Sequence, residues 1–431
     1  MRNKTAVFII SLYASTTLIP VASAEQAMAW RECVAEAAKN NPQLIAAVEV
    51  VKGQQAAKTV VTSGLLPQFD GTFGASRAQS ASNDNTSGIR ESITNSYSYG
   101  VNGSQLIFDG FTTYNKVRAA AENVAAARYA YRFTSSTVRL DLRAAFINLL
   151  KAQELIRVAE EIFKIRKDDL NRVTLRYQSG LEHKGALMTA QANLADAELG
   201  LAQARRDVVL SQRQMTKEMG RRKFEPMSVE GTFEVKDSAR EQPDLERLAD
   251  ATPSVMQAAS QTRAAAATVD AALGTFAPQV SGTMGANKAN TNSQWPPRGN
   301  EWDMGISVSM PLFDGAQRLG QLAQDRAAYK QAQESQRNTR DAAIVNLEDA
   351  WVALQNAMDL VRVQRMTLDA TQERSRIAES QYSAGFMTFD NWIIIEDDLV
   401  RSKRAYLDAE AAALVAEAKW IQAKGETLEY E

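Results

Sequence analysis

The chain has 431 residues, 45% hydrophobic and 23% charged, with 49 basic and 51 acidic residues and a formal net charge of −2 at pH 7. This balance is not typical of a nucleic-acid binder, so we expect no nucleic-acid partner. The one cysteine, Cys33, excludes an internal disulfide, and the one histidine, His183, leaves too few residues for a histidine metal site or a Ser-His-Asp triad. We therefore expect no enzyme: no catalytic residue, no metal and no cofactor.

Residues 1–24 have the pattern of a secretory signal peptide. Arg2 and Lys4 precede an apolar stretch from Ala6 to Ile19, and Ala22-Ser23-Ala24 is an A-x-A cleavage site. The mature chain is expected to begin at Glu25, which is not the cysteine that a lipoprotein anchor requires. No later stretch approaches the roughly 18 apolar residues of a spanning helix. We expect an exported protein without a helical membrane anchor.

Long helices are predicted where glycine and proline are missing. Residues 111–179 and 321–384 contain neither, and both stretches are rich in Ala, Arg, Gln, Glu and Leu. At 1.5 Å per residue, helices of this length are rods of roughly 100 Å, too long to be buried inside a globule. The predicted helices are at about 112–178, 184–219, 253–276, 316–384 and 388–424.

The chain also contains an internal repeat. The segment from Asn41-Pro42 to Pro67-Gln68 matches Thr252-Pro253 to Pro278-Gln279 with a shift of 211 residues, whereas Phe108-Asp109-Gly110 matches Phe313-Asp314-Gly315 with a shift of 205. A length change confined to one polar segment predicts an exposed loop there. The predicted organisation is a signal peptide at 1–24, a first repeat at 25–220, a linker at 221–243 and a second repeat at 244–431.

The helices carry coiled-coil seams. In the helix after Gly180, apolar or small residues follow alternating steps of three and four, which is a period of 3.5, and the same seam recurs 205 residues later. A related seam runs from Val138 to Phe163 in the first long helix. The matching seams are Leu187, Ala190, Leu194, Ala197, Leu201, Ala204, Val208, Ser211 and Met215, and Trp392, Ile395, Leu399, Ser402, Tyr406, Ala409, Ala413, Ala416 and Trp420.

Between the helices, apolar and polar residues alternate with period two, most clearly from Trp302 to Met310. Strands of about ten residues are long enough to span a membrane, although a soluble half-buried hairpin has the same pattern. We expect β-hairpins at about 67–108 and 278–313, with polar turns at 80–95 and 288–300 and a stiff external tip at Trp295-Pro296-Pro297.

Four strands per chain cannot close a membrane barrel, because unpaired backbone groups in hydrocarbon cost several kcal/mol each. If these strands span a membrane, several chains must share one barrel. The same assembly would bury the helix seams against neighbouring chains. The sequence therefore predicts an obligate oligomer.

The chain resembles the TolC family of outer-membrane efflux and secretion ducts over essentially the whole mature sequence. The resemblance implies a mostly α-helical homotrimer in which long antiparallel coiled-coil helices form a periplasmic tunnel. Four transmembrane β-strands per chain would form a shared 12-stranded β-barrel, in contact with lipid, in the outer membrane of a Gram-negative bacterium. It also implies a periplasmic adaptor protein and an inner-membrane pump, either ABC-type or proton-driven. The residues that carry it are CVAEAAKNNP at 33–42, Leu66-Pro67-Gln68, LIFDG at 106–110, PLFDG at 311–315, and the tips at 176–181 and 381–386.

The resemblance also implies functional residues. In the family, the tips of the helix hairpins receive the adaptor. Here the corresponding residues are Arg176, Tyr177, Gly180, Leu181, Gln381, Tyr382, Gly385 and Phe386.

The family often has an aspartate six residues beyond each tip glycine, where this chain has Ala186 and Asn391. We therefore consider Asp390, Asn391 and Glu396 as candidates for the periplasmic gate. The alternative for Asp390 is that it caps the following helix. His183 is expected to be exposed in a turn and Cys33 to be buried.

The function implied is that of a passive exit duct in a tripartite efflux system. Type I protein secretion is an alternative, and FDNWIIIEDDL at 389–399 resembles family members that serve ABC-type exporters. An alternative of another class is a secreted coiled-coil structural or adhesive protein with soluble hairpins.

Overall fold

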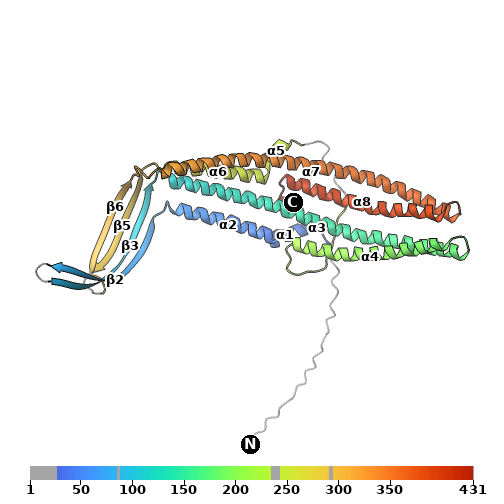
Figure 1. Cartoon of the computed structure of the whole chain (residues 1–431), viewed down its shortest axis with the longest axis horizontal. Coiled ribbons are helices and arrows are strands. Elements are labelled where there is room, and N and C mark those ends of the chain that lie inside the picture. The colour runs from blue at the N-terminus through green and yellow to red at the C-terminus, as the bar shows by residue number, and fades with distance from the viewer. Residues whose placement is uncertain (1–26, 85–87, 234–242, 291–294, 431) are drawn as a thin grey trace, which may run out of the picture.

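The protein is elongated, with a bundle of helices along most of its length and a twisted β-sheet at one end (Figure 1). The computed structural model describes residues 27–84, 88–233, 243–290 and 295–430. The signal peptide predicted at 1–24 lies outside these residues. Among the described residues, no helix combines the length and the apolar content that a membrane-spanning helix requires.

The helices of the two halves have matching lengths. α2 (Pro42–Ser63) and α6 (Pro253–Gly274) have 22 residues each, α3 (Thr112–Gln178) and α7 (Gln317–Ser383) have 67 each, and α4 (Lys184–Glu218) and α8 (Phe389–Ala423) have 35 each. At 1.5 Å per residue, α3 and α7 are about 100 Å long. The smaller elements are α1 (Trp30–Asn40), α5 (Leu245–Ala251), the 3-10 helix η1 (Leu428–Tyr430), and the two-residue strands β1 (Ala27–Met28) and β4 (Ser228–Val229).

The helices form one curved layer. α2 and α4 lie end to end on one side of α3, α6 and α8 lie end to end on its other side, and α7 packs against α6 and α8 (Figure 1). The predicted seams of α4 and α8 face inward, since every one of their residues is buried or half-buried. α3 is therefore the central helix of the layer, whereas α7 on one side and α2 with α4 on the other are its edges.

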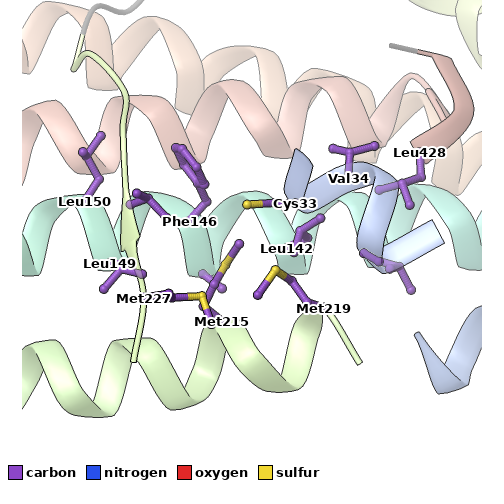
Figure 2. Close-up of a cluster of buried hydrophobic side chains, with 14 of the residues drawn as sticks. Cys33, Val34, Leu142, Phe146, Leu149, Leu150, Met215, Met219, Met227 and Leu428 are labelled. Carbon is purple, nitrogen blue, oxygen red and sulfur yellow. The ribbon is translucent and has the colours of Figure 1, made fainter. Parts of the chain in front are cut away.

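A compact core joins these helices near the middle of the helical part. Side chains from α1, α3 and the end of α4 meet there, with Cys33, Leu142, Met215 and Met219 fully buried among them (Figure 2). Burial, followed by the nearby carboxylates of Glu36 and Glu32, raises the pKa of the Cys33 thiol to about 12. As predicted, Cys33 is a small apolar core residue, and its thiol stays protonated and unreactive.

The sheet contains four antiparallel strands in the order β2-β3-β5-β6. They are β2 (Gln68–Asp84), β3 (Gly88–Phe108), β5 (Gln279–Asn290) and β6 (Gly299–Ser309). The turn predicted at 80–95 is too long, because β2 and β3 stay paired from Gln68↔Ser104 to Asp84↔Gly88, and residues 85–87 lie outside the described residues. The residues of this extension are mostly polar, so the alternation is too sparse to reveal the strands, and backbone pairing does not require it. The predicted turn at 288–300 is likewise too long: β5 and β6 are still paired at Lys288↔Asn300 and Ala289↔Gly299.

The register sorts the side chains of the sheet onto two faces. One face consists of every second residue in each strand. These residues are at alternate positions from Phe69 to Ala81, Ile93 to Gln105, Val280 to Asn290 and Asn300 to Val308. This face carries most of the large apolar side chains of the sheet, among them Phe73, Trp302, Met304 and Ile306, and we call it the apolar face. The intervening residues, mostly Ser, Thr, Asn and Gly, form the polar face.

Charge is sorted in the same way. Among residues 69–81, 93–105, 280–290 and 300–308, the acids Asp70, Glu301 and Asp303 lie on the polar face, and the bases Arg77 and Lys288 lie on the apolar face. On the polar face, the Asn287 side-chain amide donates to Asn102 Oδ1 at 3.2 Å. A sheet with one apolar and one acidic, hydrogen-bonding face is suited to separate lipid from water.

Candidate functional site

The helix hairpins α3–α4 and α7–α8 end in two tips of the same geometry. Gly180 and Gly385 have positive φ angles of 72° and 80°. In the first tip, Leu181 N donates to Arg176 O at 2.9 Å, and in the second, Phe386 N donates to Gln381 O at 2.8 Å. These are Schellman turns, in which glycine accepts the left-handed conformation that a side chain would disfavour.

Each tip ends where the next helix is capped. His183 Nδ1 accepts from Ala186 N at 3.1 Å at the start of α4, and Thr388 Oγ1 accepts from Asn391 N at 3.5 Å at the start of α8. His183 is exposed in the turn, as predicted. Thr388, rather than Asp390, is therefore the N-cap of α8, and the capping alternative for Asp390 is wrong. Asp390 lies in the first turn of α8, where a negative charge interacts favourably with the helix dipole.

Several of the predicted tip residues are exposed at the end of the molecule. Leu181 and Phe386 have exposed fractions of 66% and 87%, and neighbouring Leu175 and Met188 are also exposed. Tyr177 is exposed less, and the two glycines face open space. Apolar side chains in such positions form an accessible surface for a protein partner.

Tyr382 differs from the other tip residues because its side chain is fully buried. Its ring stacks on that of Trp392, also fully buried, with centroids 4.4 Å apart and an interplanar angle of 5°. Val173, Ala186 and Phe389 belong to the same cluster, so all four helices of the two hairpins contribute to it. Tyr382 thus stabilises the tips from inside rather than offering a contact surface.

Three contacts of Tyr382 link the second tip to the first. Its hydroxyl donates to Glu182 Oε2 at 3.0 Å, its carbonyl accepts from Arg176 Nη1 at 3.2 Å, and the Arg176 guanidinium lies 4.7 Å from the centre of its ring. Burial, followed by the hydrogen bond to Glu182, raises the pKa of the Tyr382 hydroxyl far above its ordinary value. Tyr382 therefore remains a neutral donor, and the two tips are held as one unit.

The gate candidates on α8 separate into two groups. Asp390 and Asn391 are exposed in the first turn of α8. Glu396 is buried, with 4% of its surface exposed, and accepts a hydrogen bond from Ser375 Oγ at 2.6 Å. The prediction of Glu396 as a pore-lining residue is wrong for this conformation, because its side chain lies between α8 and α7.

A group of buried charged residues lies in the helix hairpins near the tips, and it was not predicted from the sequence. Arg166 of α3 is almost fully buried, pairs with Asp397 of α8, and lies 3.7 Å from Asp169. Burial, followed by repulsion from Glu396, raises the pKa of Asp169 to about 7 against the opposing effect of Arg166. The sequence does indicate that Arg166 is buried, because it occupies the next position of the seam that runs from Val138 to Phe163.

The comparison with protein families decides the assignment. The chain matches the family described as outer membrane efflux protein in two segments, residues 33–221 and 245–429. The chain belongs to this family. The two matched segments are separated near the predicted linker at 221–243, and together they cover most of the chain.

Several relatives of this efflux protein are distant in sequence but cover most of its length. The "Outer membrane efflux protein BepC" of Brucella suis is 23% identical over 397 residues, which is 90% of this chain and 84% of BepC. Among solved structures, a membrane protein from Pseudomonas aeruginosa has a TM-score of 0.82 at 17% identity, covering 91% of this chain and 93% of that one. The outer membrane protein VceC from Vibrio cholerae has a TM-score of 0.79 at 18% identity, covering 93% and 96%.

The family resemblance to outer-membrane ducts is thereby confirmed, together with the outer-membrane location and the mixed helical and β-strand fold. This efflux protein belongs to a class of channels and not to a class of enzymes. The family assignment decides against the alternative of a secreted coiled-coil adhesive protein.

Proposed function

We propose that this efflux protein is the outer-membrane exit duct of a tripartite system, in which three identical chains form one continuous channel. The observation that carries the proposal is the placement of two matched tips at one end of 100 Å helices and an amphipathic sheet at the other. An object of this shape can connect a periplasmic partner with the outer membrane.

The sheet supports a shared barrel. Its outer strands, β2 and β6, each pair on one side only within the chain. An open edge is not tolerated in hydrocarbon, so the edges must be closed by other chains. Three chains supply twelve strands, an even number within the range of outer-membrane barrels.

The helices present matching edges on the same two sides. β2 follows α2, and β6 precedes α7, so each edge of the sheet continues into an edge of the helical layer. Both helical edges expose apolar side chains: Ile45, Val48, Leu199 and Leu210 on α2 and α4, and Val345, Val352, Leu360, Val363 and Met366 on α7. Pairing β2 of one chain with β6 of the next therefore also packs α2 and α4 against the neighbouring α7. Such head-to-tail contacts close into a ring.

The tips are the proposed contact for the periplasmic adaptor, with Leu181 and Phe386 as the main apolar contacts and Arg176 and Tyr382 as internal supports. Asp390 and Asn391, exposed beside the second tip, are proposed to line the narrow entrance of the tunnel. An inner-membrane pump is the proposed source of energy for export.

The first test is the native mass of the protein extracted with detergent from the outer-membrane fraction. A mass of three chains supports the shared barrel. A monomer that stays soluble without detergent contradicts both the barrel and the duct.

The second test concerns the tips. Gly180→Trp and Gly385→Trp force a bulky residue into a left-handed turn at the proposed docking surface, so export should be lost while trimers remain in the membrane. Ala412→Trp is the control, because Ala412 is also small and exposed but lies far along α8 from the tip and outside the two edges of the helical layer. Full export by both tip variants would exclude the tips from the mechanism.

A further inference from the structure

The apolar face of the sheet is not uniformly filled. A shallow depression of about 590 Å³ lies across the strands, with Gly71, Val101 and Ala286 forming one row beneath it. The larger side chains of Phe73 and Tyr99 stand on one side, and Trp302 stands at the β6 end of the row. Small residues between large ones leave a space open to the exterior that apolar chains can fill.

A second depression continues the first along the strands. The next row of the apolar face contains Phe69, Gly103, Met284 and Met304, which line a space of about 240 Å³. The two depressions therefore follow each other on the same face and in the direction of the strands. The Phe69 and Met284 side chains cover Gly103 between them, and we call the two adjoining depressions together the apolar groove.

One end of this groove carries a positive charge. Lys288 lines the first depression, lies opposite Tyr99 on β3 and Asn300 on β6, and is exposed. Among residues 69–81, 93–105, 280–290 and 300–308, the register places no acid on the apolar face. Glu301 also lines the first depression, but it alternates with Asn300 and Trp302 and so belongs to the polar face. A lysine directed at lipid is costly unless its ammonium group meets an anion or water.

Aromatic side chains surround this end of the groove. The Trp295 ring lies 5.8 Å from that of Phe73, 5.8 Å from that of Tyr97 and 6.0 Å from that of Tyr99. The predicted external loop tip at Trp295-Pro296-Pro297 is thus folded onto the apolar face of the sheet. Tryptophan and tyrosine gather at the boundary between hydrocarbon and headgroups, which places Lys288 at that boundary.

The position of Lys288 along its strand gives the same depth. It lies nine residues beyond Gln279, where β5 leaves the helical end of the sheet. This is about 30 Å along the strand, or roughly 21 Å along the barrel axis at a tilt of about 45°. The apolar band of outer-membrane barrels is about 25 Å tall. Lys288 is therefore near the outer edge of the band, far from the periplasm.

We propose that this groove binds one phosphorylated glycolipid of the outer leaflet, with Lys288 contacting a phosphate and an acyl chain lying along Val101, Ala286 and Met284. The proposal rests on the proposed function, because it requires the apolar face to meet the membrane. A lipid in the groove would fill the space beside the small residues and neutralise the lysine.

The experiment is native mass spectrometry of the detergent-purified protein mixed with bisphosphorylated lipid A. Removal of one positive charge near a lipid surface should reduce retention of this lipid about fivefold in Lys288→Gln. Lys288→Arg should retain it as the wild type does, whereas Ala286→Trp should lose it because the ring fills the groove. Lys330→Gln, an exposed lysine on α7 outside the sheet, is the matched control and should behave as wild type.

Two further probes test the source of the phosphate. The first probe is lipid A without phosphates. The wild type should retain it as poorly as Lys288→Gln retains bisphosphorylated lipid A. The second probe is inorganic phosphate, which should not displace bisphosphorylated lipid A from the wild type. Equal retention by wild type and Lys288→Gln, or displacement by inorganic phosphate, overturns the proposal. If the duct itself were wrong, the wild type would be missing from the outer-membrane fraction, whereas failure of the lipid site alone leaves all variants there at normal levels.

Discussion

Trp392→Ala provides a direct test of how the tips are held. The indole of Trp392 is fully buried and stacks on Tyr382 within a cluster drawn from α3, α4, α7 and α8. Truncating a buried tryptophan to alanine costs about 3 to 5 kcal/mol, because contacts are lost and a cavity remains. The cluster lies at the ends of the hairpins, so the cost should fall on the tips rather than on the distant core around Cys33.

The measurement is hydrogen exchange of the backbone amides at the tips, in the detergent-extracted protein. A loss of about 3 kcal/mol corresponds to exchange more than about 100-fold faster, through local opening. Phe386→Ala is the matched control, because Phe386 is 87% exposed at the same tip and its truncation should change stability by no more than about 0.5 kcal/mol. Unchanged exchange in Trp392→Ala, or equal acceleration in Phe386→Ala, would refute the reasoning.

Three further predictions concern the sheet and the buried charges. Ile306→Arg places a charge on the apolar face and should destabilise the inserted barrel by about 2 to 4 kcal/mol, measured by refolding into vesicles. Ser307→Arg on the polar face should be tolerated. Equal losses of stability in the two variants would contradict the assignment of faces. Since the pKa of Asp169 is raised to about 7, the folded chain binds its proton more tightly than the unfolded chain, and stability should fall as pH rises from about 4 to 7. Asp169→Asn should flatten this profile in thermal unfolding across that range, and the exposed neighbour variant Asp168→Asn should not. Asp303→Asn removes an acid from the polar face and should weaken the preference for cations, measured as a shift in reversal potential across a salt gradient in planar bilayers.

Much of the helical part could be predicted from the sequence, because its rules are local. Glycine and proline are absent from residues 112–178, and α3 spans those same residues. The tip glycines, Gly180 and Gly385, follow from the need for a left-handed residue at each helix end. The seams of α4 and α8 follow from a period of 3.5 that places their residues on one side of each helix.

The errors arise where long-range packing overrides local pattern. Glu396 is charged, and a charged residue is normally exposed. It lies instead on the side of α8 that faces Ser375, so its burial could not be predicted from charge alone. Arg166 occupies a seam position and is accommodated only because Asp397 of the other repeat lies opposite. The strands β2 and β3 continue through mostly polar residues, where too few apolar side chains alternate to mark the backbone pairing.

The sorting of charge between the faces of the sheet has a consequence for the fidelity of assembly. A slip of one residue in the pairing of a strand exchanges its two faces. For β6, such a slip would move Glu301 and Asp303 into hydrocarbon and Trp302, Met304 and Ile306 into water. Each misplaced acid costs free energy in the membrane, so wrongly registered strands are unstable intermediates that can dissociate and pair again. The arrangement that separates lipid from solute in the finished barrel thus also rejects errors while the barrel forms.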